Sequence, residues 1–63
     1  MRKIVDLYKR SAKDQLVWTY IIQLGQDGSH PSLLDYKEEA LRLALVDKLG
    51  TEQSLLIKVR GYE

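Results

Sequence analysis

The fold class is decided by one stretch of the sequence, Leu16-Val17-Trp18-Thr19-Tyr20-Ile21-Ile22-Gln23-Leu24. It is rich in β-branched and aromatic side chains, which favour strands. Its even positions all carry large apolar side chains, whereas its odd positions are mixed. Because successive side chains of a strand point to opposite faces, this alternation predicts a strand over 16–24 whose even positions face the core.

A second strand is predicted near the end of the chain, over 54–60. Its odd positions are apolar, and its even positions include the basic residues Lys58 and Arg60. This alternation is typical of a strand with one buried face and one solvated face. The apolar set consists of Leu55, Ile57 and Val59.

The N-terminal segment 3–9 supports two interpretations. It is a strand if Val5 and Leu7 face inward. It is a helix if Ile4, Tyr8 and Ala12 form one apolar stripe, because residues four apart share a helix face. We favour the strand, and the helix stays open as the alternative.

The parity of a hairpin supports the strand. A four-residue loop over 11–14 places Leu7 opposite Trp18, and by the same register Val5 opposite Tyr20. Residues that lie directly opposite each other in an antiparallel pair share a face, so the two apolar sets match. A slip of one residue places the two sets on different faces.

A helix is predicted over 36–49. Asp35 is the expected N-cap, because Glu38 follows three residues later and completes a capping box. Ser32 with Asp35 is a competing start. Gly50 is the expected residue just beyond the last turn, where glycine is favoured.

These elements predict one α+β domain over 1–63 in the order β-β-α-β. The three strands form one sheet, and the helix packs on one of its faces. Ala40 and Ala44 lie one turn apart, and their small side chains allow the helix to approach the sheet closely. The third strand lies beside either the first or the second, and the sequence does not choose between them.

Composition excludes several classes of protein. The chain has 63 residues and no cysteine, which excludes disulfides, thiolate catalysis and cysteine-ligated metals. The net charge of +1 is too even for a dedicated nucleic-acid or membrane-surface binder, although five of the ten basic residues lie in the first fourteen. No run of 18 apolar residues and no signal-peptide pattern occurs, so we expect no membrane segment and a cytoplasmic location.

No pattern in the sequence indicates catalysis. The single histidine, His30, lacks a second ligand at a suitable spacing, and Gly25 with Gly28 is a turn signal rather than a phosphate loop. A sheet with one helix also has little room for a ligand pocket, which typically occupies about 300–1,000 Å³. The sequence therefore predicts a protein that is not an enzyme, with no catalytic, cofactor-binding or metal-binding residue and no small-molecule substrate.

The remaining candidate is the sheet face opposite the helix, which no predicted element covers. We expect an apolar centre with aromatic and basic side chains at its margin, which is typical of protein contact surfaces. The predicted function is a small interaction module that forms a homodimer or docks on a larger protein. The alternative is weak binding of single-stranded nucleic acid. A second route to contact is the addition of a strand at a free edge of the sheet. The predicted interaction face consists of Tyr8, Arg10, Val17, Thr19, Ile21, Leu56, Lys58, Arg60 and Tyr62.

Overall fold

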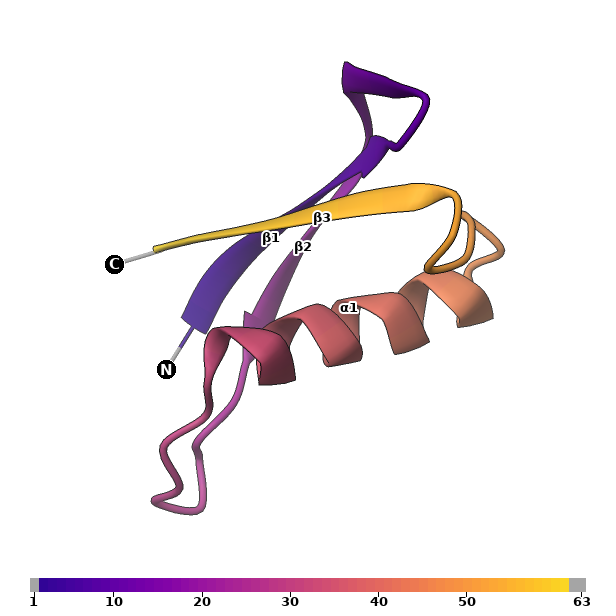
Figure 1. Ribbon diagram of the computed structural model, residues 1–63. Helices are drawn as coiled ribbons and strands as arrows, with labels where there is room; N and C mark the ends of the chain where they lie inside the picture. The colour runs from indigo at the N-terminus through magenta and orange to yellow at the C-terminus, as the bar shows by residue number, and fades with distance from the viewer. Residues whose placement is uncertain (1, 62–63) are drawn as a thin grey trace.

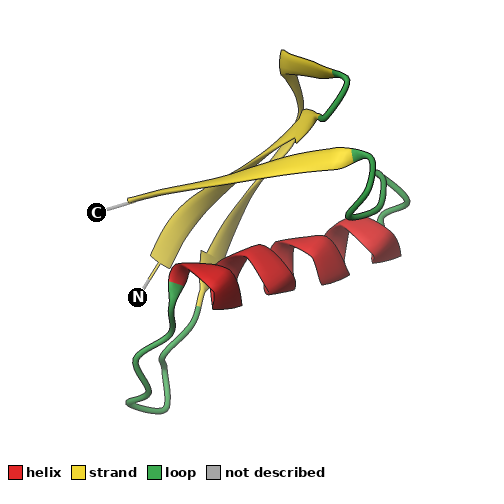
Figure 2. Cartoon of the chain, in the orientation of Figure 1, coloured by secondary structure: helices red, strands yellow, loops and turns green. Residues whose placement is uncertain are grey.

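The computed structural model describes residues 2–61. It confirms the predicted α+β fold with the order β-β-α-β, a single three-stranded sheet and one helix (Figures 1 and 2). The helix packs on one face of the sheet and completes one compact domain. The elements are β1 (Arg2–Lys9), β2 (Ala12–Gln23), α1 (Leu33–Val46) and β3 (Leu55–Gly61).

The sheet has the strand order β2-β1-β3, and both pairs are antiparallel. The N-terminal segment is therefore a strand, and its helical alternative is wrong. The third strand lies beside the first, which settles the question left open by the sequence. Because β1 is central, β2 and β3 are both edge strands with one unpaired side each among the described residues.

The hairpin has the predicted register but a different turn. Leu7 lies opposite Trp18, as expected. The pairing extends to Lys9 and Ala12, however, so the predicted loop over 11–14 is wrong and a two-residue turn joins the strands. Between Ala12 and Trp18, β2 has more residues than the part of β1 that it pairs with. The unpaired residues of β2 form bulges, which bend the strand.

The helix begins three residues earlier than the leading expectation. Ser32 is the N-cap, and its Oγ accepts a hydrogen bond from the Asp35 amide at 3.3 Å. The Asp35 carboxylate in turn accepts from the Ser32 amide at 2.8 Å. The competing start was therefore correct, and the capping box of Asp35 with Glu38 is wrong.

The helix also ends earlier than predicted, at Val46. The Lys48 amide donates to the Leu45 carbonyl and the Leu49 amide donates to the Ala44 carbonyl, which is the Schellman pattern. Lys48 rather than Gly50 takes the left-handed position, with φ 58°. Gly50 has a different role, because a Cβ there would lie 2.7 Å from the Ser54 Oγ.

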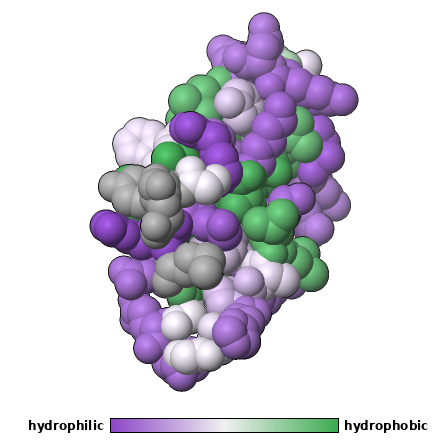
Figure 3. Space-filling view, turned by 90° about the vertical axis from the view of Figure 1, so that its left-hand side faces the viewer, coloured by the Kyte–Doolittle hydropathy of each residue, from purple (hydrophilic) through white to green (hydrophobic). Residues whose placement is uncertain are grey.

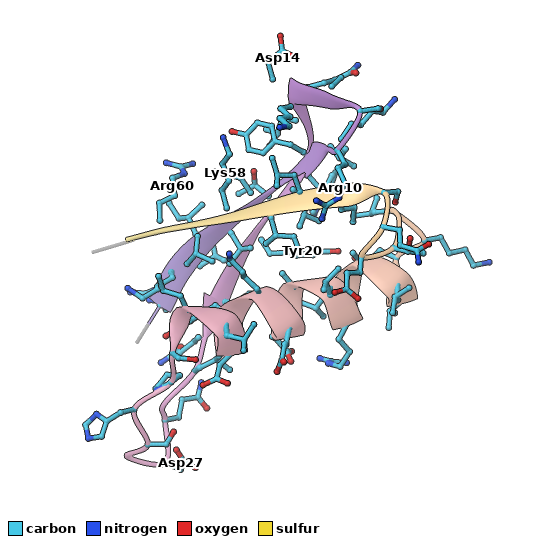
Figure 4. The ribbon with its side chains drawn as sticks, viewed as in Figure 1. Arg10, Asp14, Tyr20, Asp27, Lys58 and Arg60 are labelled. Carbon is cyan, nitrogen blue, oxygen red and sulfur yellow. The ribbon has the colours of Figure 1, made fainter. Side chains whose placement is uncertain are left out.

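The core lies between the sheet and α1. Tyr36, Ala40 and Ala44 are buried on the helix face that meets the sheet. The small alanine side chains let the helix approach closely, as predicted. The Tyr20 ring also lies between the two layers (Figure 4). The buried apolar residues are Val5, Leu7, Ile22, Tyr36, Ala40, Ala44 and Leu55.

The far half of β2 departs from the predicted alternation. Leu16 and Trp18, both expected to face the core, are each 53% exposed. Val17 was expected on the opposite face, but it packs against the core cluster. For Leu16 and Val17 the physical reason is the bulge at Val17, which shifts the alternation on its turn side. Trp18 keeps the predicted face opposite Leu7, and its exposure follows from the path of the hairpin. Figure 1 shows the turn end of the β1–β2 hairpin rising away from α1, so the helix does not cover it.

Candidate functional site

The sheet face turned away from α1, which we call the open face, consists of three rows of residues that lie opposite each other across the strands, together with the pair of Arg2 and Gln23. No described element covers this face. In Figure 4 the side chains of Lys58 and Arg60 point from β3 away from the helix. The rows are Ile21–Ile4–Arg60, Thr19–Asp6–Lys58 and Leu16–Tyr8–Leu56.

The centre of the open face is a carboxylate. Asp6 is only 5% exposed. Its Oδ2 accepts a hydrogen bond from Arg60 Nε at 2.6 Å, and its Oδ1 accepts one from Thr19 Oγ1 at 2.8 Å. The expectation of an apolar centre is therefore wrong. A buried charge is tolerated here because it has an ionic partner and hydrogen bonds from both neighbouring strands.

The partners of Asp6 also set its titration. The hydrogen bond from Arg60 lowers the pKa of the Asp6 carboxyl below its ordinary value, and the bond from Thr19 acts in the same direction against the opposing effect of burial. The carboxylate is consequently ionised at neutral pH. It holds the Arg60 guanidinium against the sheet, although that side chain remains 61% exposed.

A cation also covers the aromatic ring of the open face. Lys58 Nζ lies 5.1 Å from the centroid of the Tyr8 ring, within the range of a cation–π interaction. The ring is therefore occupied by a side chain of its own sheet. A nucleic-acid base that stacked on Tyr8 would have to displace Lys58.

The structure brings together six of the nine residues predicted for the interaction face. Val17 lies elsewhere, because it packs against the core, and Arg10 lies in the turn between β1 and β2. Tyr62 is outside the described residues. Those on the open face are Tyr8, Thr19, Ile21, Leu56, Lys58 and Arg60.

Asp6 is a residue of the open face that the predicted interaction face did not include. Its signal was present, because an acidic residue between the inward-facing Val5 and Leu7 must lie on the opposite face. The register of the hairpin also places it opposite Thr19. Asp6 is also a candidate partner of Lys58 and Arg60 from the sequence, and the position of β3 beside β1 brings Arg60 within hydrogen-bond distance of it.

Arg10 occupies backbone carbonyl groups at the start of the β3 edge. Its guanidinium donates to the Leu55 carbonyl at 2.9 Å and to the Glu52 carbonyl at 3.1 Å. Figure 4 shows this side chain against the start of β3. The Arg10 backbone amide donates to the Ser54 carbonyl at 3.0 Å. The expectation that Arg10 lies on the open face is therefore not met, and its charge serves the start of the edge strand.

Two of the hollows among the described residues lie outside the open face. One, of about 500 Å³, opens widely beside the loop between β2 and α1 and is lined by Asp27, His30 and Asp35 among others. Asp27 is used in the turn itself, since its Oδ1 accepts a hydrogen bond from the Ser29 amide at 3.0 Å. The other, of about 240 Å³, is a groove between α1 and β3. Within residues 2–61, no three ligand-type side chains cluster as a metal site would require.

Apolar surface is exposed on more than one element. Figure 3 shows a broken band of apolar surface with hydrophilic surface on both sides. On the sheet, the large apolar side chains that are more than half exposed all belong to β2. They are Leu16, Trp18 and Ile21.

Comparisons with known proteins leave the function to be inferred from this geometry. No protein-family model, curated protein or solved structure matches the chain. The one helix of the described residues is too short and too polar to cross a membrane.

Proposed function

We propose that the chain is a non-enzymatic interaction module that acts by protein–protein contact, as a homodimer or by docking on a larger protein. The observation that carries this proposal is the one-sided packing of the sheet. One face is covered by α1, and the other is an uncovered surface with Ile21 58% exposed. Contiguous surfaces that combine exposed apolar side chains with arginine and tyrosine are typical of protein contacts.

The charges on the open face support a partner with an acidic surface. Arg2, Lys58 and Arg60 lie on it with a single acidic residue, Asp6, whose carboxylate is already engaged. A partner surface with acidic side chains complements this excess of positive charge. A cytoplasmic location is part of the same proposal.

Charge reversal on the open face tests the proposal. Lys58→Glu removes a cation from the centre row, so we expect it to abolish capture of a partner that the wild-type chain retains from its native cell extract. Lys37→Glu is the matched control, because it changes the net charge equally from an exposed position on α1. Capture that survives Lys58→Glu, or that is lost equally in both variants, contradicts docking through the open face.

The second candidate function is weak binding of single-stranded nucleic acid. It is supported by the three basic residues of the open face, which suit a phosphate backbone. Against it, Lys58 covers the Tyr8 ring and Arg60 is paired with Asp6. Titration with an oligonucleotide at about 50 mM salt distinguishes the candidates, because nucleic-acid binding weakens steeply as salt rises. Tight, salt-sensitive binding there would favour the second candidate.

A further inference from the structure

The outer edge of β2 exposes backbone groups that can be identified from the ladder. The Arg10 amide donates to the Ser54 carbonyl, so the even residues of β1 direct their backbone groups toward β3. The odd residues, including Leu7, then direct theirs toward β2. On β2, Trp18 and Tyr20 bond inward to β1, and the groups of Thr19 and Ile21 point outward.

Apart from the bulge at Val17, this edge lacks the features that normally protect an edge strand. Natural sheets guard edges with charged side chains, proline, short strands or bulges. The segment 17–23 contains no charged residue and no proline, and the nearest charge on the strand, Asp14, lies beyond the bulge at Val17. Trp18 and Ile21 are each more than half exposed beside it. An edge of this kind requires a cover.

A second copy of the chain fits this edge without a conflict of charge. Antiparallel pairing about a two-fold axis at Ile21 places Thr19 opposite Gln23 of the second copy. Pairing about an axis at Thr19 places Trp18 opposite Tyr20 of the second copy. Neither register opposes two like charges, and each uses the outward backbone groups.

The β3 edge does not offer the same fit. The groups of Leu55 are already engaged, because its amide donates to the Thr51 carbonyl and its carbonyl accepts from Arg10. Only the groups from Ile57 onward remain for pairing. A two-fold axis at Lys58 opposes two lysines, and an axis at Val59 opposes Lys58 to an arginine.

We propose, resting on the interaction function above, that two copies associate by antiparallel pairing of their β2 edges. The product is a continuous six-stranded sheet with both helices on one face and both open faces on the other. Two open faces side by side make the dimer bivalent toward a partner.

The apolar area indicates a weak association. Leu16, Trp18 and Ile21 are about half exposed, so an edge-to-edge contact covers at most on the order of 300 Å² of apolar surface per chain. With the backbone included, the interface remains below the roughly 1,200 Å² at which specific, stable complexes begin. We therefore expect a dimer whose population depends on concentration in the micromolar to millimolar range.

Sedimentation equilibrium with fluorescence of Trp18, the only tryptophan of the chain, tests the proposal. Wild type should pass from monomer to dimer, with a blue shift of Trp18 emission at the same midpoint. Ile21→Pro removes an outward amide and no bond to β1, so it should fold and weaken the dimer at least tenfold. Gly61→Pro is the matched control on the other edge, where a Cβ meets nothing within 4 Å, and it should dimerise like wild type.

Two further variants separate edge pairing from contact between open faces. Ile21→Lys keeps the backbone amide and places a charge in the seam, so it should also give a folded monomer. Leu56→Lys lies at the opposite margin of the open face and should leave the dimer intact. A dimer that is lost in Leu56→Lys but kept in Ile21→Pro overturns the β2 pairing. A wild-type chain that is monomeric at millimolar concentration also overturns it, yet leaves docking through Lys58 to be decided by its own test.

Discussion

The two edge strands of this sheet are protected very differently. On β3, Arg10 occupies the first free carbonyl, and Lys58 and Arg60 place charge along the edge that remains. On β2, the segment 17–23 carries no charge at all. The comparison shows that protection against edge pairing belongs to each strand separately. One edge of a sheet can therefore be protected against pairing with a second copy of the chain while the other edge is not.

The same two strands also differ in how far they are buried against the rest of the molecule. At its start β3 buries Leu55, which is 2% exposed. Over its turn-side half β2 buries no side chain, and Trp18 remains 53% exposed. Asp6 joins both strands through Thr19 and Arg60. The comparison therefore makes predictions about stability as well as association.

The largest expected effect is the difference between Leu55→Ala and Trp18→Ala. Leu55→Ala leaves a cavity in the core and should lower the free energy of unfolding by about 2–4 kcal/mol. Trp18→Ala removes a side chain that is about half exposed to solvent, so we expect the free energy of unfolding of the monomer to fall by less than about 1 kcal/mol. Urea unfolding followed by circular dichroism at low concentration measures both. A larger loss for Trp18 than for Leu55 would contradict the assignment of the core.

The order of elements and the hairpin register could be predicted because both follow from a period of two. Apolar side chains alternate on each strand, and a slip of one residue from the observed register would place Val5 and Leu7 on a different face from Tyr20. The bulge at Val17 could not be predicted in this way, since it depends on a turn tighter than the apolar pattern requires. Its consequence is that Leu16 lies opposite Tyr8 on the open face instead of facing the core.

The candidate site was predictable in its margin and not in its centre. The alternation of β3 placed Lys58 and Arg60 on the open face. The ion pair of Asp6 depends on which strand β3 joins, and that choice involves residues 54 positions apart in sequence. Local patterns do not contain this information.

The second prediction concerns Asp6→Asn, which removes the charge that ties both edges to β1. Because hydrogen bonds to a charged group contribute about 1–3 kcal/mol, we expect the free energy of unfolding to fall by about that amount at pH 7. The folded pKa of Asp6 is lowered, so its contribution is present above the unfolded pKa of about 4 and is lost as the pH falls through the folded value.

Urea unfolding as a function of pH measures this contribution. The wild-type chain should lose stability from about pH 5 downward, and the Asp6→Asn variant should lose less of it over the same interval. Glu39→Gln is the matched control, because Glu39 pairs with Arg42 at the surface of α1 and touches neither edge. An acid profile that is unchanged in Asp6→Asn but altered in Glu39→Gln would place the acid-sensitive contact on the helix.

The third prediction concerns Tyr20, which holds β2 to the end of α1. Its hydroxyl donates to the Asp47 carboxylate, and burial followed by this bond raises the pKa of Tyr20 to about 12. A raised folded pKa stabilises the chain below the unfolded value of about 10, and the contribution is lost as the pH rises toward 12. At pH 7, Tyr20→Phe should lower the free energy of unfolding by less than Asp6→Asn does. Between pH 10 and 12, the free energy of unfolding of the Tyr20→Phe variant should fall less than that of the wild-type chain. Denaturant unfolding across this interval measures this difference, and identical alkaline profiles of the two chains would exclude the ionisation of Tyr20 as a cause of the alkaline loss of stability.

The smallest expected effect comes from removing the charge of Lys58, which protects the β3 edge against pairing. In an Ile21→Pro background, where β2 pairing is blocked, Lys58→Thr removes the like charges that oppose each other about an axis at Lys58. Ile57 then lies opposite Val59 of the second copy, and threonine suits a strand. The free segment is short, and Arg60 remains beside it because Asp6 holds it. We therefore expect only a several-fold rise in the association constant by sedimentation equilibrium, which corresponds to about 1 kcal/mol or less.

Lys37→Thr in the same background is the control and should leave the association constant unchanged. If Lys58→Thr leaves the association as weak as Lys37→Thr does, the charge on β3 is not what closes this edge, and the capping of Leu55 by Arg10 with the short length of the free segment is sufficient.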